Sequence, residues 1–348
     1  MRIIIPVLGM GRAGGERVLS KLASELVRLG NEVFFVTPMS NTGPYYSTTA
    51  KVIYSKKSDS RSKVIRFFLD IIYLWRACKD INADAVIANY HLTAYIASML
   101  LTRKQRFYYV QAYEVNFSSN LFRKMIAYIS YLLPLNIIVN SEALLPKMIN
   151  KYNGFLTVIP AGIDYKLFYD EEMPSISGKI NLGIIGRQEH YKGTKEILGI
   201  LSKYILDNKL DERINVNVAV YMPEVEHKIN SLRHYKISND VELSNFYKIN
   251  DIFIATGLVE DGAFHYPCAE AMTAGCLVIS NYAPLCDTSS TLKLTTFSEI
   301  EINNALMKIF NLTPDEIAHE VSSNQAIMST FAWNMVGVKM NSVLQSIK

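Results

Sequence analysis

Residues 1–36 read MRIIIPVLGMGRAGGERVLSKLASELVRLGNEVFFV, and this stretch decides the fold. Arg2–Leu8 is a continuous apolar run, which is typical of a strand buried on both faces of a sheet. A glycine-rich turn follows at Gly9–Gly15, and Glu16–Leu29 then carries apolar residues at helical spacing until Gly30. Glu32–Val36 predicts a second buried strand, so the chain begins with a strand–helix–strand unit.

The same alternation continues to the end of the chain, with helical stretches between the strands. Strands are predicted at Lys51–Tyr54, Ala85–Ala88, Phe107–Val110, Asn136–Val139, Lys179–Ile185, Asn215–Val220, Val241–Leu243, Asp251–Ala255 and Cys276–Ser280. Repeated units of this kind imply parallel sheets covered by helices on both faces. We therefore expect an α/β protein with two Rossmann-like halves.

The polar segment Tyr169–Gly178, with its Pro and Gly, is predicted to be the linker between these halves. This places one domain at residues 1–170 and the other at residues 171–330. Ligands of such sheets bind beyond the carboxyl ends of the strands, so two facing sheets predict a binding cleft between the domains.

The two halves differ in charge although the whole chain is only +4. Residues 1–170 hold 21 Lys and Arg against 11 Asp and Glu, whereas residues 171–348 hold 15 against 21. The first half is therefore basic and the second acidic, which indicates different partners for each. The basic residues are scattered rather than aligned on one predicted helix, which argues against nucleic-acid binding.

The four cysteines, at positions 78, 268, 276 and 286, form no CxxC pair and have no histidine cluster beside them. They are interpreted as small buried residues, not as metal ligands or disulfides. Nothing at the start resembles a signal peptide, and the longest apolar stretch, residues 125–139, is broken by Pro134 and Asn136. A bilayer-spanning helix needs about 20 apolar residues, so none is expected.

The turn Gly9–Gly14 reads GMGRAG, a GxGxxG pattern between a strand and a helix. A dinucleotide site also requires an acidic residue at the end of the second strand, where this chain has Thr37 and Pro38, so NAD or FAD is disfavoured. The helix start at Gly14 and Gly15 still offers backbone N–H groups to an anion, for which we expect a diphosphate. A tight turn without any ligand is the alternative.

The second half contains two further candidate segments. Arg187 and Lys192 lie in the loop GRQEHYKG (186–193), where a guanidinium and an ammonium group suit a diphosphate and would stabilise charge on a leaving nucleotide. In PCAEAMTAG (267–275), Glu270 lies one turn into a predicted helix, where its carboxylate can accept both hydroxyls of a ribose. The preceding turn, Gly262, Ala263 and Phe264, can offer N–H groups to a sugar or phosphate. Solvated surface charges are the alternative for each segment.

With these segments in place, the sequence resembles glycosyltransferase family 4, a family of retaining enzymes with the GT-B fold. The resemblance is carried in order by AGGERVLSKLASELVRLGNEV (13–33), VIPAGIDYKLF (158–168), GRQEHYKG (186–193), PCAEAMTAGCLVIS (267–280) and FAWNMVGVKMNSVL (331–344). The last segment is similar to a C-terminal helix that crosses back to the first domain, here residues 331–348. VIANYHLTAY (86–95) and YYVQAYE (108–114) are similar to members that build rhamnose- or mannose-containing surface polysaccharides such as lipopolysaccharide O-antigen.

The resemblance implies the roles of the site residues. The diphosphate of a nucleotide-sugar donor would lie against Arg187, Lys192 and the turn at Gly14 and Gly15, with Glu270 on the ribose. The leaving phosphate would accept the acceptor's proton on the same face of the sugar, so the configuration is retained without a protein nucleophile or a cofactor. No Asp-x-Asp triplet occurs in the chain, which agrees with a reaction that needs no metal.

One departure from the family concerns its first glutamate. The position that this glutamate takes in the family is occupied by Gly262, with Glu260 and Asp261 just upstream. Asp261 or Glu260 would then orient the transferred sugar. A catalytically silent subunit that binds nucleotide sugars stays an alternative on this ground, and a nucleotide-sugar epimerase is a further one that explains the two cationic and acidic segments less well.

The basic half is expected to receive a glycan or a lipid-linked acceptor. Asn89 and His91 follow one predicted strand, and Gln111 and Glu114 follow the next, so they are candidates for contacting the sugar or the acceptor, although a lone histidine is often structural. Basic and apolar residues alternate in residues 56–75 and 121–133, which fits either an anionic membrane surface or ordinary amphipathic helices. The expected location is the cytoplasm, with peripheral contact to the inner face of the membrane as an open alternative.

Overall fold

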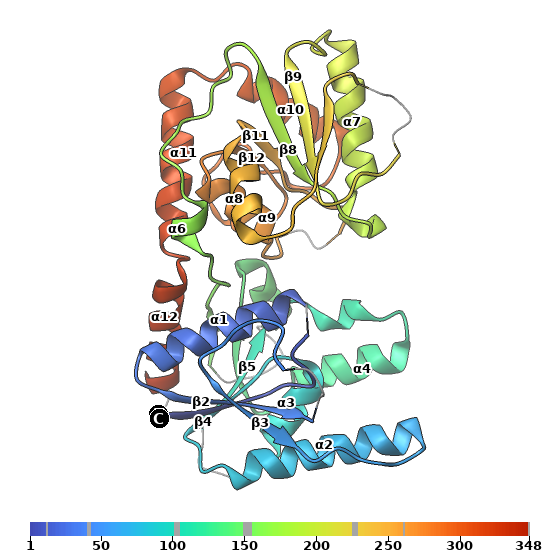
Figure 1. Ribbon diagram of the computed structural model, residues 1–348, viewed down its shortest axis with the longest axis vertical. Coiled ribbons are helices and arrows are strands. Elements are labelled where there is room, and N and C mark those ends of the chain that lie inside the picture. Colours follow the sequence, from blue (N-terminus) through green and yellow to red (C-terminus); the bar gives the residue numbers. More distant parts are fainter. Residues whose placement is uncertain are drawn as a thin grey trace. The chain divides into compact units, whose positions relative to one another are not determined.

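The computed structural model describes residues 1–11, 13–39, 43–100, 105–148, 155–224, 229–259 and 262–346. The chain forms two compact units (Figure 1). The first contains Met1–Gly162 together with Trp333–Lys348, and the second contains Ile163–Ala332. Each unit is built around one parallel sheet, as the alternation of strands and helices predicts.

The sheet of the first unit has seven strands in the order β3-β2-β1-β4-β5-β6-β7. Their bounds are β1 (Arg2–Pro6), β2 (Glu32–Pro38), β3 (Lys51–Ser55), β4 (Ala85–Ala88), β5 (Gln105–Val110), β6 (Asn136–Val139) and β7 (Leu156–Val158). In the register, Ile4 of β1 lies opposite Phe34 of β2 and Val86 of β4. All three side chains are buried, which explains why the central strands read as unbroken apolar runs.

The helices of this unit cover both faces of the sheet. They are α1 (Gly14–Arg28), α2 (Lys63–Asp80), α3 (His91–Ser98), α4 (Leu121–Ser130), α5 (Leu145–Met148) and α12 (Trp333–Ser346). The step from β1 to β2 runs along the sheet in one direction, and the step from β3 to β4 runs in the opposite direction. Because both crossovers are right-handed, α1 and α2 lie on opposite faces of the sheet. Figure 1 shows α1 above the strands of this unit and α2 below them.

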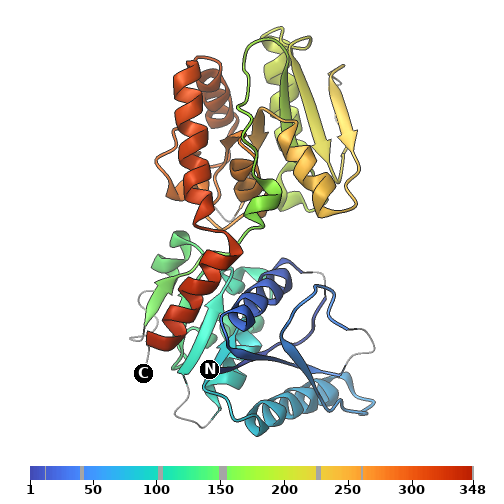
Figure 2. The ribbon, with the colours of Figure 1, turned by 60° about the vertical axis from the view of Figure 1, so that its left-hand side comes forward.

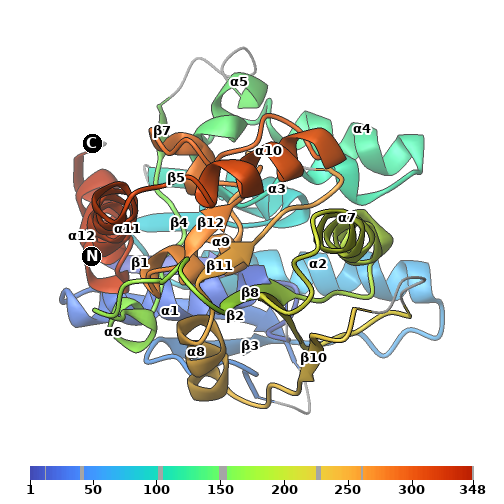
Figure 3. The same ribbon diagram turned by 90° about the horizontal axis from the view of Figure 1, so that it is seen from above.

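The second unit has five strands in the order β10-β9-β8-β11-β12. Their bounds are β8 (Ile180–Ile185), β9 (Ile214–Ala219), β10 (Leu232–Tyr235), β11 (Ile252–Ile254) and β12 (Leu277–Ile279). The helices are α6 (Tyr165–Phe168), α7 (Thr194–Asp207), α8 (Asp240–Lys248), α9 (Tyr266–Thr273), α10 (Glu299–Ile309) and α11 (Pro314–Ser329). Figure 3 shows α7 and α10 on one side of β8 and α8 on the other.

One predicted strand is wrong. Val241–Leu243 lies inside the helix α8, and the strand in this region is β10, which pairs with β9. The helix begins there because Asn239 caps it: its side-chain oxygen accepts a hydrogen bond from the amide of Glu242 at 2.9 Å, and the Glu242 carboxylate accepts one from the amide of Ser238 at 2.8 Å. These local hydrogen bonds override the strand preference of a short apolar pair.

The boundary between the units also differs from the prediction, because it lies at residues 162 and 163 and not at residues 170 and 171. The segment Tyr169–Gly178, predicted as the linker, belongs to the second unit. Gln325 donates a hydrogen bond to the carbonyl of Asp170 at 2.7 Å, and the amide of Ser175 donates one to Asp251 at 3.0 Å. The polar composition of the segment therefore reflects a surface loop, not a boundary.

The C-terminal helix completes the first unit, which confirms the crossing-back helix of the fold prediction. Figure 2 shows α12 alongside α1. Gly337 of α12 packs so close to Glu25 that an added Cβ would lie 2.6 Å from the Glu25 Cβ. Asn31 donates a hydrogen bond to the side chain of Asn341 at 2.9 Å. A glycine at the contact thus allows two helices distant in sequence to approach closely.

Among the residues that the structure describes, no helix is both long and apolar enough to cross a membrane.

Candidate functional site

The cationic loop of the second unit is held in a fixed shape by glycine and threonine. Gly186 follows β8, and an added Cβ there would overlap the carbonyl oxygen of Tyr221, so only glycine fits. The amide of Arg187 donates to the Thr194 hydroxyl at 2.9 Å, and that hydroxyl donates to the Arg187 carbonyl at 3.1 Å. The loop is therefore fastened to the first residue of α7.

This loop carries two cationic side chains, Arg187 and Lys192. Arg187 is exposed, and in the described part of the chain its guanidinium has no ion-pair partner. The Lys192 ammonium lies 4.9 Å from the ring centroid of Tyr191 and 5.5 Å from that of Tyr282. The sequence prediction that both cations share this loop is confirmed; their contact with a diphosphate stays a prediction.

Glu270 lies deeper than an acid at the mouth of a site would. It belongs to α9 and is 2 % exposed, and its carboxylate accepts a hydrogen bond from the Tyr247 hydroxyl at 2.9 Å. Burial, together with the negative charge of Glu270, raises the pKa of Tyr247 well above its ordinary value, so the phenol stays a donor. Tyr247 thereby orients the carboxylate, and its contribution was not foreseen from the sequence.

His265 is a second residue that the sequence analysis missed. It directly precedes α9, its ring lies 4.4 Å from that of Tyr282, and its Nδ1 is buried without a hydrogen-bond partner. Burial and the positive charges of Lys192 and Arg187 hold its pKa well below 6.5, so the imidazole is neutral. This electrostatic coupling shows that His265 belongs to the same cluster as the two cations.

The turn before α9 offers fewer N–H groups than predicted. Gly262 has a φ of +74°, and its amide already donates to the carbonyl of Asn281 at 2.8 Å. Gly262 is therefore not a free donor, while Ala263 and Phe264 show no backbone acceptor for their amides among the described residues. Glu260 and Asp261 lie outside the described residues.

A pocket of about 570 Å³ adjoins the cationic loop within the second unit. Its lining includes Arg187, Glu189, Thr194, Ser202, Tyr221 and Pro223. This volume falls in the range of about 300–1,000 Å³ that is typical of small-molecule sites. The loop thus presents its arginine to a cavity large enough for part of a nucleotide.

In the first unit, His91 and Glu114 form a dyad at the carboxyl edge of the sheet. Glu114 is 4 % exposed, and its Oε2 lies 2.7 Å from Nδ1 of His91 and accepts the His91 amide at 2.8 Å. Oε1 of Glu114 accepts a hydrogen bond from the Tyr108 hydroxyl at 2.7 Å, and the backbone amide of Glu114 donates one to the Tyr131 hydroxyl at 2.8 Å. Because the ionised carboxylate can only accept, Nδ1 carries the proton and Nε2 is left for a ligand.

The other predicted residues of the first unit lie at the same edge. Gln111 donates from its side chain to the carbonyl of Gly15 at 3.2 Å, which joins the end of β5 to the start of α1. The backbone amide of Asn89 donates a hydrogen bond to the Thr93 hydroxyl at 3.2 Å. Gln111 and Asn89 are thus held by local contacts, and Gly14 and Gly15 begin α1 as predicted. Their contact with a substrate stays a prediction.

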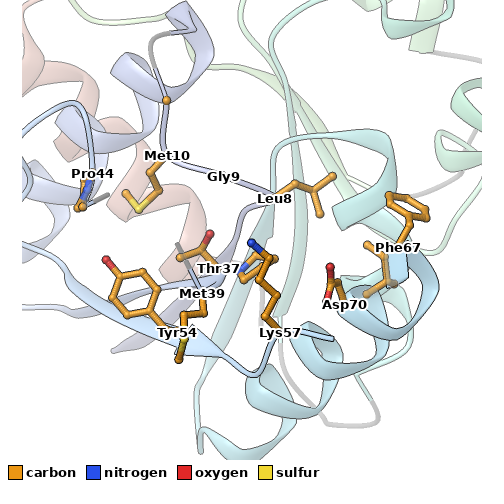
Figure 4. Close-up of a pocket in the computed structure, with 14 residues that line it drawn as sticks. Leu8, Gly9, Met10, Thr37, Met39, Pro44, Tyr54, Lys57, Phe67 and Asp70 are labelled. Atoms are coloured by element: carbon orange, nitrogen blue, oxygen red, sulfur yellow. The ribbon is translucent and has the colours of Figure 1, made fainter. Parts of the chain in front are cut away.

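A second pocket, of about 460 Å³, opens in the first unit where β1, β2 and β3 end (Figure 4). Its lining includes Gly9, Met10 and Gly11 of the GxGxxG turn, and the pocket itself was not predicted from the sequence. Within the described residues, no three His, Cys, Asp or Glu side chains gather in a way that could hold a metal ion. All four cysteines are free thiols.

The profile of glycosyltransferase family 4 matches residues 12–167. The structure is similar to that of sucrose-phosphate synthase from Thermosynechococcus elongatus, with a TM-score of 0.75 and 15 % identity over 99 % of this chain and 98 % of that one. It is also similar to Anabaena HepE in complex with UDP and glucose, with a TM-score of 0.72 and 14 % identity over 99 % of each chain.

A third similar structure is the lipopolysaccharide outer core galactosyltransferase WaaB, with a TM-score of 0.74 and 14 % identity over 99 % of each chain. No curated protein is similar enough in sequence to match. Residues 12–167 therefore match the profile of glycosyltransferase family 4, and the chain as a whole has the fold of the GT-B glycosyltransferases.

Proposed function

We propose that this protein is a retaining glycosyltransferase that moves a hexose or deoxyhexose from a nucleotide diphosphate sugar to a glycan or lipid-linked acceptor during surface polysaccharide synthesis. The observation that carries the proposal is the cluster of Arg187, Lys192, His265 and Glu270 in the second unit. Two cations, a neutral imidazole and a buried carboxylate match the diphosphate and the ribose hydroxyls of such a donor. HepE, a structural neighbour, was solved with UDP and glucose, which supports this donor class.

In the proposed reaction, the bond between the sugar's anomeric carbon and the diphosphate oxygen breaks, and the acceptor oxygen bonds to that carbon on the same face. The acceptor proton passes to the departing phosphate oxygen, so no protein group is consumed. Arg187 and Lys192 stabilise the negative charge that grows on the leaving nucleotide, which removes the need for a divalent cation. Asp261 or Glu260 would orient the transferred sugar.

His91 is proposed to orient the sugar or the acceptor hydroxyl through Nε2. The Glu114 carboxylate fixes its tautomer and ring orientation, as a second group does for a catalytic histidine in other enzymes. The backbone N–H groups at Gly14 and Gly15 begin a 15-residue helix whose dipole favours an anion, and we propose that they add to diphosphate binding.

We further propose that the first unit contacts an anionic membrane. On α2, Val64, Ile65 and Phe68 are 55–65 % exposed, and on α4, Leu121 and Phe122 are 64–81 % exposed. The basic residues Arg61, Lys63, Arg66, Arg123 and Lys124 flank them. Exposed apolar residues among basic ones are the composition of helices that lie on anionic lipid. Phosphatidylglycerol vesicles should sediment the protein and phosphatidylcholine vesicles should not; equal sedimentation would contradict the proposal.

The test of the donor site is a thermal-shift screen without metal, using UDP-, GDP-, dTDP- and ADP-sugars and NAD. A ligand that binds only the folded state raises the melting temperature, so one nucleotide sugar should give a shift and NAD should not. Arg187→Ala and Lys192→Ala should each reduce turnover about 100-fold, which corresponds to the loss of one group that stabilises the transition state. Arg233→Ala, an exposed arginine on the edge strand β10, is the matched control.

Near-normal turnover in both cation variants would refute the diphosphate assignment. Donor binding without donor hydrolysis or transfer would favour the silent-subunit alternative. A shift with NAD alone would mean that the GxGxxG turn binds a dinucleotide after all.

A further inference from the structure

The pocket in the first unit has the position and size of a ligand site, and the proposed transfer reaction places no substrate group on the residues that line it. It opens at the carboxyl ends of β1, β2 and β3, which is the edge where parallel sheets bind ligands. Its volume of about 460 Å³ is that of a small-molecule site. Figure 4 shows that its walls come from the turn after β1, from β2 and β3, and from α2.

Much of the lining of this pocket is apolar. Leu8, Met10, Met39, Phe67 and Ile71 line it. Met39 is 54 % exposed and Phe67 is 44 % exposed, so large apolar side chains remain in contact with solvent at a concave surface. Covering such surface stabilises a complex by about 25 cal/mol per Å². This lining therefore favours a ligand with a hydrocarbon part.

The lining also carries one cation, Lys57. The Lys57 side chain points into the pocket, and in the described part of the chain its ammonium has no ion-pair partner (Figure 4). Asp70 also lines the pocket, and its Oδ1 accepts a hydrogen bond from the backbone amide of Ser58 at 2.7 Å. The neighbouring Lys56 is held 5.8 Å from the ring centroid of Tyr73 and does not line the pocket. Lys57 is thus placed to bind an anionic group.

The apolar lining continues beyond the pocket along α2. The ring of Phe67 lies 5.8 Å from that of Phe68, which is 61 % exposed. A hydrocarbon chain longer than the pocket would therefore find further apolar surface on the same helix. A fully polar sugar would gain nothing from this surface.

We propose that the pocket binds the acceptor as an amphiphile, with a phosphate group on Lys57 and a hydrocarbon chain over Met39 and Phe67. The inference rests on the proposed function, because it names the acceptor class as a glycan linked to a lipid through phosphate.

The test is isothermal titration of the full-length protein with octyl phosphate, octyl glucoside and inorganic phosphate, each below any micelle-forming concentration. Octyl phosphate should bind at least about 10-fold more tightly than the other two, since only it has both an anionic group for Lys57 and a hydrocarbon chain for the apolar lining. Lys57→Ala should weaken octyl phosphate about 5- to 10-fold and leave octyl glucoside unchanged, as expected for one partly exposed charged contact. Phe67→Ser should weaken both octyl compounds.

Lys56→Ala is the matched control and should change nothing. Equal binding of inorganic phosphate would reduce the pocket to an anion site, and equal binding of octyl glucoside would reduce it to an apolar patch; either result overturns the proposal. No binding of octyl phosphate, or an equal effect of the two lysine variants, would also overturn it. Donor binding by the wild-type protein is measured separately, so the pocket and the proposed function fail independently.

Discussion

Replacing Tyr247 by phenylalanine removes one oxygen atom from the centre of the second unit and tests how Glu270 is held. The Tyr247 hydroxyl is fully buried and donates to the Glu270 carboxylate at 2.9 Å. A hydrogen bond to a charged group contributes about 1.5–3 kcal/mol, and the variant leaves that carboxylate buried with one donor fewer. We therefore expect Tyr247→Phe to lower the free energy of unfolding by about 2 kcal/mol.

The assay is urea unfolding of the full chain, supported by thermal melting. A loss of about 2 kcal/mol corresponds to a decrease in melting temperature of about 4–8 °C for a unit of this size. Tyr109→Phe is the matched control, because that buried hydroxyl donates to the neutral carbonyl of Ile159 at 3.1 Å and should cost only about 1 kcal/mol. If Tyr247→Phe costs no more than Tyr109→Phe, the carboxylate of Glu270 is not held as an anion by this bond, and the reasoning fails.

Two further predictions concern the histidines. In the folded protein the pKa of His265 is held well below 6.5, its ordinary value in an unfolded chain. At a pH between the folded and the unfolded pKa, the unfolded chain binds one proton more than the folded one. The free energy of unfolding therefore falls as the pH decreases through 6.5. In urea unfolding between pH 7.5 and 5, the His265→Gln variant should lose less stability than the wild-type protein, by up to about 1.4 kcal/mol per pH unit. If the free energy of unfolding has the same pH dependence in both proteins, the pKa of His265 is not lowered by folding and the prediction fails. His91→Ala and Glu114→Gln should each reduce kcat about 10-fold or more, and the double variant should be no slower than His91→Ala, because the pair acts as one unit; additive losses would contradict the dyad.

Much of the fold could be predicted because parallel strands buried on both faces have an unmistakable pattern. Arg2–Leu8 and Glu32–Val36 read as apolar runs, and they correspond to β1 and β2 in the sheet of the first unit. The edge strand β10 could not be found in this way, because Leu232–Tyr235 is partly exposed and contains Arg233 and His234. The boundary at residue 162 was missed for a related reason: surface loops and linkers have the same polar composition.

The candidate site was predictable where its residues are close in sequence. Arg187 and Lys192 lie on one loop between a strand and a helix, which the sequence pattern indicates directly. The partner of Glu270 could not be predicted, because Tyr247 is 23 residues away and reaches it only through the packing of α8 against α9. His265 was overlooked because nothing in its sequence neighbourhood shows that Lys192 and Arg187 surround it.

The placement of α12 has a consequence for the order in which the protein is built. Residues 1–162 are synthesised before the second unit, but α1 cannot meet Gly337 until the whole of the second unit has been made. N-terminal domains commonly fold during synthesis. Here the first unit reaches its final form last, and the second unit is the one that can fold as a continuous segment.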